Sequence, residues 1–346
     1  MRVPHTAPLP APSRRRFLGL GLGAAAVATG LAAPQLAAFA RAAEDFIKGP
    51  PMPDIAPRQL SPHVWMIHAR DGFPTPENQG MMSNITFVLS REGVIVLDPG
   101  GSLQIGEMAI RQLRRLTDKP VLAVFNSHYH GDHWLANHAF VDAYGVDLPI
   151  YAHAVTRREI EGVQGSAWLS LMERWTNQAT AGTRIVAPNR TVAHGAEFRF
   201  GDLTLRVHHY GTAHTPGDLC VEVVEDKLTF IGDIAMDRRI ANMDDGSYLG
   251  TFRYYDALEK HAPSTIWVPG HGQPGPDVLA WNRELFAGIY ENCVAAVEAG
   301  DSMEAARTRV LRDPRVASKA ADTAGFDGNI GKYVSLAYLE AEKEAF

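Results

Sequence analysis

The chain contains only two cysteines, Cys220 and Cys293, among its 346 residues. So few cysteines exclude a disulfide framework, and they leave two alternatives: a pair of inert core thiols or a single bridge. Internal repeats and low-complexity tracts are also missing from the sequence. The Gly-x-Ser-x-Gly motif of many serine hydrolases is absent as well. With 46% hydrophobic residues, the chain can still bury one large core or two smaller ones.

Acidic residues are missing from the first 43 residues, which carry five arginines. Of the 33 basic residues in the chain, 28 therefore remain in the rest of it, against 39 acidic ones, which gives a net charge of −11. A mature chain this acidic is a poor candidate for binding nucleic acid or anionic membranes. The composition therefore favours a small-molecule substrate over a polyanionic partner.

Residues 1–43 have the layout of an export signal. Three arginines at 14–16 precede an apolar stretch over 18–33, and Ala40-Arg41-Ala42 offers a small-residue cleavage site. Four glycines make the stretch weakly hydrophobic for an anchor, so we expect no stable membrane insertion after its removal. Paired arginines before Phe-Leu resemble a twin-arginine signal, which implies export of a folded protein to the periplasm or beyond. An ordinary secretory signal or an uncleaved anchor is the alternative.

Beyond a Pro-rich linker at residues 44–58, strand-like and helix-like patterns alternate up to about residue 276. Residues 277–346 read as a helical region, and Ser102 is a candidate cap for an earlier helix that runs to Leu116. This alternation predicts sheets covered by helices. The predicted strands are Val64–Ile67, Ile85–Leu89, Val94–Leu97, Val121–Phe125, Leu203–His209, Cys220–Val224, Leu228–Ile231 and Ile266–Val268.

The chemistry-bearing motif is His128-Tyr129-His130-Gly131-Asp132-His133, directly after an apolar run read as a buried strand. Two histidines at i and i+2, followed by Asp-His, can offer one pair of ligands to one metal ion and the other pair to a second. Imidazole and carboxylate are ligands that zinc and non-haem iron favour.

Three further candidate ligands each follow a predicted strand. His214 stands in a Thr-Ala-His-Thr-Pro-Gly loop, Asp233 ends Phe-Ile-Gly-Asp, and His271 stands in Pro-Gly-His-Gly. Any one of them alone would be an ordinary loop residue. Together with the first motif they complete two metal sites.

These motifs resemble the pattern of the metallo-β-lactamase superfamily over roughly residues 59–275. The pattern is HxHxDH, then a His before Thr-x-Gly, then Asp or Cys, then a last His, and Asp98 matches an early Asp-x-Gly strand end. The resemblance implies an αββα sandwich with the site at one edge, between two sheets.

The resemblance also implies a role for each residue. His128, His130 and His214 would hold one metal ion, and Asp132, His133 and His271 the second. Asp233 would bridge the two ions together with a water or hydroxide, and Asp132 is the expected catalytic residue. Asp98 would orient the ligand loop, with a helix-capping role as the alternative.

The implied activity is hydrolysis of an ester, thioester, lactone or related bond by a metal-bridging hydroxide, with two zinc ions expected. Iron or manganese accept the same ligands. The aspartate at position 233 is similar to glyoxalase II-like thioesterases, lactonases, alkylsulfatases and phosphodiesterases rather than to β-lactamases, and parts of the chain resemble exported hydrolases linked with sulfur-oxidation or quinoprotein systems. The alternatives are an iron persulfide dioxygenase-like enzyme, a β-lactamase and a non-catalytic periplasmic metal-binding accessory protein.

Substrate contacts are expected from loops near these ligands. A Gly- and Pro-rich loop at 71–83 could fold over the site as a flap with Phe73 at its tip, and Tyr129 and Trp134 lie inside or beside the ligand loop. Other aromatic or apolar positions are expected in the protein core: Trp168, Leu171, Met172, Trp175, Tyr254 and Tyr255.

Overall fold

The computed structural model describes residues 48–70, 72–240 and 243–345. The predicted export signal, residues 1–43, lies outside the described residues, as do residues 44–47 of the predicted linker. Within the described ranges, no helix has both the length and the apolar character needed to cross a bilayer.

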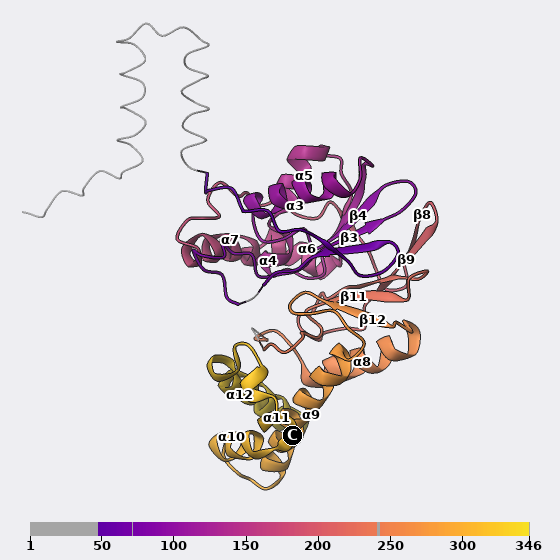
Figure 1. Cartoon of the computed structure of the whole chain (residues 1–346). Coiled ribbons are helices and arrows are strands. Elements are labelled where there is room, and N and C mark those ends of the chain that lie inside the picture. The colour runs from indigo at the N-terminus through magenta and orange to yellow at the C-terminus, as the bar shows by residue number, and fades with distance from the viewer. Residues whose placement is uncertain (1–47, 71, 241–242, 346) are drawn as a thin grey trace, which may run out of the picture. The chain divides into compact units, whose positions relative to one another are not determined.

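The first sheet has seven strands in sequence order, from β1 to β7 (Figure 1). Its first three strand pairs, from β1 to β4, are antiparallel, and the pairs from β4 to β7 are parallel. The strands are β1 (Arg58–Gln59), β2 (Val64–Ile67), β3 (Ile85–Leu89), β4 (Val94–Leu97), β5 (Val121–Phe125), β6 (Ile150–Ala152) and β7 (Arg190–Thr191).

The second sheet has five strands in the order β12-β11-β10-β9-β8. Its pairs are antiparallel except for β11 with β12, which run parallel. The strands are β8 (Glu197–Phe200), β9 (Leu203–His208), β10 (Cys220–Val223), β11 (Leu228–Gly232) and β12 (Ile266–Pro269). All eight predicted strands are confirmed, with boundaries that differ by one residue at most.

The two sheets pack face to face, and strand alternation explains how. Side chains along a strand point alternately to its two faces. In β4, Ile95 and Leu97 pack against the second sheet, in a cluster that includes Val221 and Phe230. The intervening Val96 faces outward, toward helices α3 (Leu103–Leu116) and α5 (Asn137–Tyr144).

Helices α8 (Tyr248–His261) and α9 (Val278–Glu298) cover the outer face of the second sheet, so the predicted αββα sandwich is confirmed. Ser102 caps α3 as predicted, because its side chain accepts a hydrogen bond from the Ile105 amide. The other helices that precede the second sheet along the chain are α4 (Gly131–Trp134), α6 (Ala154–Glu161) and α7 (Val163–Trp175).

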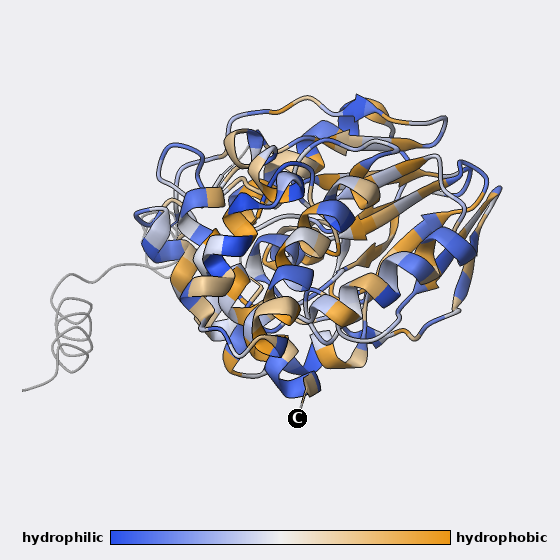
Figure 2. Ribbon diagram, turned by 90° about the horizontal axis from the view of Figure 1, so that it is seen from below, coloured by the Kyte–Doolittle hydropathy of each residue, from blue (hydrophilic) through white to orange (hydrophobic). Residues whose placement is uncertain are grey.

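The predicted C-terminal helical region is present, and within it α10, α11 and α12 pack on α9 and on the neighbouring α8. An apolar core that includes Leu285, Ile289 and Tyr333 joins these helices. Figure 2 shows hydrophilic and hydrophobic residues on each helix, as expected where one face is buried. The remaining elements are α10 (Met303–Arg312), α11 (Pro314–Ala317), η1 (Ala320–Asp322) and α12 (Phe326–Ala345).

Glu340 of α12 fastens this region to the sandwich. Its carboxylate accepts hydrogen bonds from the backbone amides of Tyr248 and Leu249 and from the Ser247 hydroxyl, at 2.7, 3.3 and 2.6 Å. These groups lie at the N-terminus of α8, where backbone amides lack partners within the helix and negative charge is favoured. A residue in the last helix therefore caps a helix about 90 positions earlier in the chain.

Candidate metal centre

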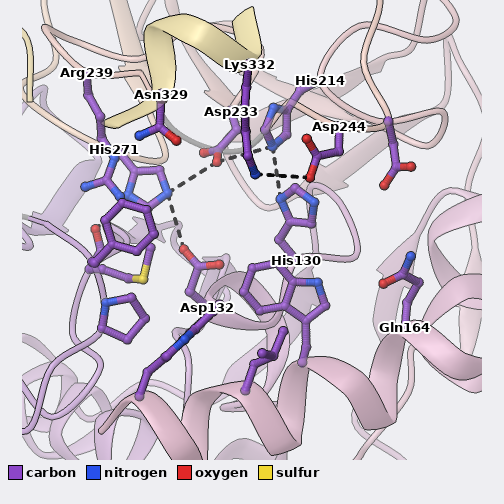
Figure 3. Close-up of a pocket in the computed structure, with 17 residues that line it drawn as sticks. His130, Asp132, Gln164, His214, Asp233, Arg239, Asp244, His271, Asn329 and Lys332 are labelled. Carbon is purple, nitrogen blue, oxygen red and sulfur yellow. Dashed lines mark hydrogen bonds and ion pairs between the residues drawn. The ribbon is translucent and has the colours of Figure 1, made fainter. Parts of the chain in front are cut away.

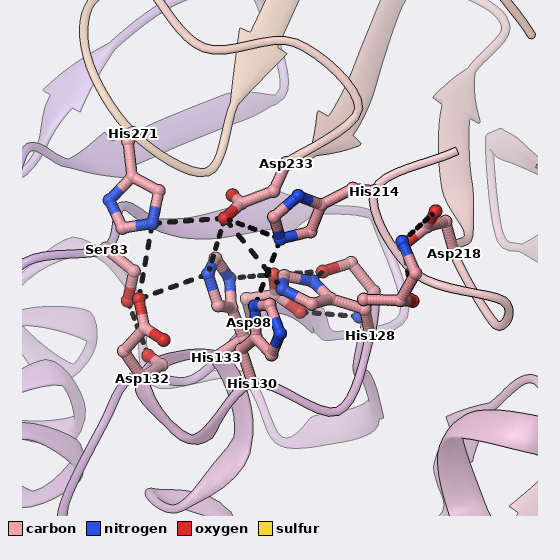
Figure 4. A network of polar contacts seen from close by, with 12 residues as sticks. Ser83, Asp98, His128, His130, Asp132, His133, His214, Asp218, Asp233 and His271 are labelled. Atoms are coloured by element: carbon pink, nitrogen blue, oxygen red, sulfur yellow. Dashed lines mark hydrogen bonds and ion pairs between the residues drawn. The ribbon is translucent and has the colours of Figure 1, made fainter. Parts of the chain in front are cut away.

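Seven histidine and aspartate side chains meet at one edge of the two sheets (Figure 4). The first sheet supplies four of them through the loop after β5 and the short helix α4. The second sheet supplies the other three from loops that follow β9, β11 and β12. The residues brought together are His128, His130, Asp132, His133, His214, Asp233 and His271, which are the seven predicted ligands.

The geometry divides these side chains into two groups. His128, His130, His214 and Asp233 each place one ligand atom within 4.8 Å of the others. A second group at the same spacing consists of Asp132, His133 and His271. Each group has enough imidazole and carboxylate donors to hold one metal ion.

Asp233 lies between the two groups. Its Oδ2 is 3.2 Å from Nε2 of His271 and 3.5 Å from Nε2 of His133, both in the second group. The same oxygen is 3.6 Å from Nε2 of His214 in the first group. One carboxylate within reach of both groups is the arrangement that a shared, bridging ligand requires.

The buried polar atoms of this cluster fit a metal site. Nε2 of His128, Nε2 of His133, Oδ2 of Asp132 and Oδ1 of Asp233 are buried and have no hydrogen-bond partner among the described residues. A buried polar atom without a hydrogen bond costs free energy, which coordination of a cation would recover. The nitrogen and oxygen donors suit zinc, iron or manganese.

Asp98 holds the ligand loop in place. Its Oδ2 is 2.7 Å from Nδ1 of His133, and its Oδ1 accepts a hydrogen bond of 2.7 Å from the Ser127 amide. The contact with Nδ1 leaves Nε2 of His133 directed at the cluster, as is usual for metal-ligating histidines. Because Ser102 caps α3, the alternative capping role of Asp98 does not apply there.

Gly270 allows the close approach of the loops. A Cβ atom at this position would meet Oδ1 of Asp233 at 2.2 Å and Cε1 of His133 at 2.7 Å. Neither atom could withdraw without moving a candidate ligand. The glycine before His271 is therefore required by the geometry of the site.

The electrostatics place two of the histidines and both aspartates in the form that binds metals, whereas the neighbouring carboxylates raise the pKa of His133 and His271 against the effect of burial. Burial lowers the pKa of His130 to about 4 and that of His214 to about 3, so both imidazoles are neutral near pH 7. Burial acts to raise the pKa of Asp132 and Asp233, but the neighbouring histidines outweigh it and hold both pKa values well below the usual range. Neutral imidazoles and ionised carboxylates are the ligand forms.

A cavity of about 450 Å³ opens over the cluster (Figure 3). Phe73 lines it as predicted and is 53% exposed. The predictions for Trp134 and Tyr129 are wrong, because neither side chain lines the cavity. Trp134 is fully buried and donates to the Tyr129 carbonyl at 2.8 Å, while the Tyr129 hydroxyl donates to Asp245.

Helix α7 also differs from expectation. Met172 is buried in the core as predicted, but Trp168, Leu171 and Trp175 line the cavity. Positions 168, 171 and 175 share one face of a helix, and Met172 lies at the buried edge of that face, where Trp168 and Trp175 pack against its cluster. The apolar pattern of this helix in the sequence did not show which of its side chains would be buried in the core and which would line the cavity. Tyr254 and Tyr255 are fully buried, as expected.

The polar residues of the cavity that the sequence analysis missed include Arg239, Asn329 and Lys332. Arg239 follows Asp233 by six positions, and the other two lie on α12, far from every ligand motif. No local pattern marks them, because their place depends on how the C-terminal helices pack. Cys220 and Cys293 are buried and free, so the structure holds no bridge between them.

The chain belongs to the metallo-beta-lactamase superfamily, whose family model matches residues 78–299. Among curated proteins, it is similar to a linear primary-alkylsulfatase of a Pseudomonas strain, at 22% identity over 263 residues. That match covers 65% of this chain and 49% of the alkylsulfatase. A hydroxyacylglutathione hydrolase of Rhizobium etli is 31% identical over 112 residues, which is 32% of each protein. The chain thus spans half or less of the curated relatives it matches.

Solved structures share the fold. A stereoselective inverting sec-alkylsulfatase from Pseudomonas sp. superposes with a TM-score of 0.65 at 16% identity, over 82% of this chain and 50% of that one. A metallo-beta-lactamase from Pontibacter korlensis gives a TM-score of 0.54 at 20% identity, over 67% of this chain and 99% of that one.

Proposed function

We propose that this protein is an exported hydrolase with two metal ions, zinc expected, that cleaves an ester, thioester, lactone or related bond of a small molecule. The observation that carries the proposal is the position of Asp233, whose Oδ2 lies 3.2 Å from His271 and 3.6 Å from His214. A carboxylate between two complete ligand groups fits two ions better than one.

Each residue has a role in this proposal. His128, His130 and His214 hold one ion, Asp132, His133 and His271 hold the other, and Asp233 is shared. Asp98 keeps His133 in position through the contact with Nδ1. When bound, a metal pair of this kind supplies a hydroxide near neutral pH and polarises the bond to be cleaved. The walls of the cavity bind the substrate and exclude bulk water from it.

The bond type follows from the ligand set and from the relatives. An aspartate at position 233, rather than a cysteine, sets the chain apart from the β-lactamase pattern. The two curated relatives are named for hydrolysis of alkyl sulfates and of hydroxyacylglutathione. These names favour ester-like and thioester bonds over β-lactams. Export by the twin-arginine route is proposed from the arginine-rich N-terminus.

The first experiment is to express the exported form at native metal supply and to measure metal identity and stoichiometry by elemental mass spectrometry. We expect about two zinc ions per chain. Turnover is then measured on ester, thioester, lactone, sulfate-ester and phosphodiester probes. Less than about a tenth of an equivalent of any transition metal, even after reconstitution, would overturn the proposal.

One observation favours a second candidate, a mononuclear iron dioxygenase acting on persulfides. His128, His130, His214 and Asp233 form a complete four-ligand group by themselves. This candidate predicts about one iron ion per chain and oxygen uptake with a persulfide. The same metal analysis therefore separates the two candidates before any substrate is tested.

A further inference from the structure

The cavity above the metal centre has two walls of different chemistry. One wall comes from α7 and the flap at 72–83, and its side chains are apolar except for Gln164: Phe73, Pro74, Trp168, Leu171 and Trp175. The other wall comes from the segment after Asp233 and from α12, and it carries Arg239, Asn329 and Lys332 (Figure 3). The candidate ligands lie between the two walls, at the floor of the cavity.

The apolar wall is a continuous surface that reaches the ligands. The ring of Trp168 lies 4.9 Å from the ring of His130, centroid to centroid. Trp175 lies edge-on to Trp168 at 6.1 Å, two helical turns further along α7. The Phe73 side chain is 53% exposed, although the Asn78 side chain holds the backbone there through hydrogen bonds with the Phe73 carbonyl and the Thr75 amide. Aromatic surface exposed toward a cavity favours an apolar alkyl or aryl group there.

Arg239 gives the opposite wall its positive charge. The residue is 5% exposed, and its charge contributes to the environment of His271. The backbone on either side of it is held by the segment between η1 and α12, because the Ile240 amide donates to the Ala324 carbonyl and the Ala324 amide to that of Arg238. A buried guanidinium offers several donors in a rigid fork that matches carboxylate, sulfate and phosphate oxygens.

The two acidic side chains that line the cavity besides the candidate ligands, Asp244 and Asp245, are exposed. Asp244 forms an ion pair with Lys332 at 3.7 Å, and both side chains are more than half exposed, at the rim. Asp245 accepts a hydrogen bond from the Tyr129 hydroxyl. Arg239 is therefore the buried cation of the wall, while Lys332 and the two aspartates form its outer, solvated part.

We propose that the site binds amphipathic anions, with an alkyl or aryl body against Trp168, Leu171 and Trp175 and an anionic group against Arg239. Because one wall is apolar and the other carries a cation, the cavity favours ligands that have both an apolar body and an anionic group. A neutral apolar ester satisfies only the α7 wall, and a small anion satisfies only Arg239. The inference rests on the proposed function for the identity of the cavity as a substrate site.

The test is calorimetric binding to the metal-loaded protein with three unreactive probes. Hexylphosphonate carries the body and the anion, methylphosphonate the anion alone, and 1-hexanol the body alone. We expect hexylphosphonate to bind at least about tenfold more tightly than either partial probe. Equal affinity for hexylphosphonate and methylphosphonate would remove the apolar wall from the proposal.

Arg239→Met is the decisive variant, and Arg238→Met, at an exposed neighbouring arginine, is its matched control. Any coordination of the phosphonate by metal is common to all variants, so the comparison isolates the guanidinium. We expect Arg239→Met to weaken hexylphosphonate binding at least about tenfold while 1-hexanol and the control variant stay unchanged. Arg239→Lys should restore part of the loss. No change in Arg239→Met with two metal ions retained would overturn the proposal.

Failure of this inference can be told apart from failure of the proposed function. Binding of hexylphosphonate that depends on Arg239, without turnover of any probe bond, would leave the inference standing and remove the hydrolase. Turnover of neutral and anionic esters at equal rates, unaffected by Arg239→Met, would do the reverse. If Arg239→Met does not fold, the comparison of the three probes on the unaltered protein still decides.

Discussion

The metal centre and the C-terminal helices are held together by opposite kinds of contact. At the metal centre, five loops and short elements each contribute one or two polar side chains, which are buried without enough hydrogen bonds among themselves. In the C-terminal helices, the interior is a continuous set of apolar side chains such as Ile289 and Val334, both essentially inaccessible to solvent. The first region therefore depends on a ligand that it must bind, whereas the second is stable through its own packing.

Removal of metal should give the largest difference between the regions. Chelation followed by gel filtration is expected to abolish turnover and to lower the melting temperature, since a ligand that binds only the folded state stabilises it by about 4 kcal/mol at 1,000 times its dissociation constant. Differential scanning calorimetry before and after chelation, with metal content measured in each sample, checks this. An unchanged melting temperature in verified metal-free protein would contradict the dependence of the metal centre on its ions.

Ile289→Ala should affect the other region alone. The side chain is fully buried in the C-terminal core, so its truncation is expected to lower the free energy of unfolding by about 2–5 kcal/mol. Metal stoichiometry should stay that of the unaltered protein. Urea unfolding and elemental analysis of the same preparation provide the two readings, and Val294→Ala, at a partly buried position nearby, is a milder control. Loss of metal in Ile289→Ala would show that the two regions are not separable.

Asp98→Asn tests how strictly the ligand loop is positioned. The amide keeps the shape of the carboxylate but lacks its negative charge. It is therefore a weaker hydrogen-bond acceptor for Nδ1 of His133 and for the Ser127 hydroxyl. We expect metal affinity or turnover to fall by about 10–100-fold. Competition with a chromophoric chelator measures the affinity directly. Asp118→Asn, at an exposed position in the loop between α3 and β5, should leave it unchanged.

The smallest expected effect is an acid sensitivity specific to the C-terminal helices. Hydrogen bonds from Arg315 lower the pKa of Asp313 to about 2 from its usual value of 3.8, against a smaller opposing effect of burial. A lowered folded-state pKa adds stability above the unfolded value and loses it as the pH falls from about 4 to about 2. Because Arg315 is 36% exposed, we expect only about 1–2 kcal/mol.

The measurement for Asp313 is the free energy of unfolding at pH 7 and at pH 3, for the unaltered protein and for Asp313→Asn. The variant should be less stable at pH 7 and lose less on acidification. Asp256→Asn, whose carboxylate is 70% exposed in its pair with Arg283, serves as the matched control. Identical pH responses in all three proteins would show that Asp313 contributes nothing to this region.

The sequence predicted the parts of the molecule that depend on local pattern. Alternating apolar residues gave strands such as Val94–Leu97, and strand ends with histidine or aspartate gave the seven side chains that the structure brings together. The walls of the cavity could not be predicted in the same way. Trp134 lies next to a ligand in sequence and is buried, whereas Lys332 lies 61 residues after His271 and lines the cavity. The number of residues between a side chain and the nearest ligand therefore does not predict whether that side chain lines the cavity.

The origin of the polar wall in α12 has a consequence for the order in which the site is made. All seven candidate ligands have been translated by residue 271, but Asn329 and Lys332 follow almost 60 residues later. At elongation rates of about 5–20 residues per second this delay is roughly 3–12 s, which is long compared with the closing of loops. A nascent chain thus contains its candidate metal ligands well before it contains the α12 residues of the wall that is proposed to select a substrate. During synthesis the cavity is therefore open and unselective at first, and it gains its second wall only when α12 has been made.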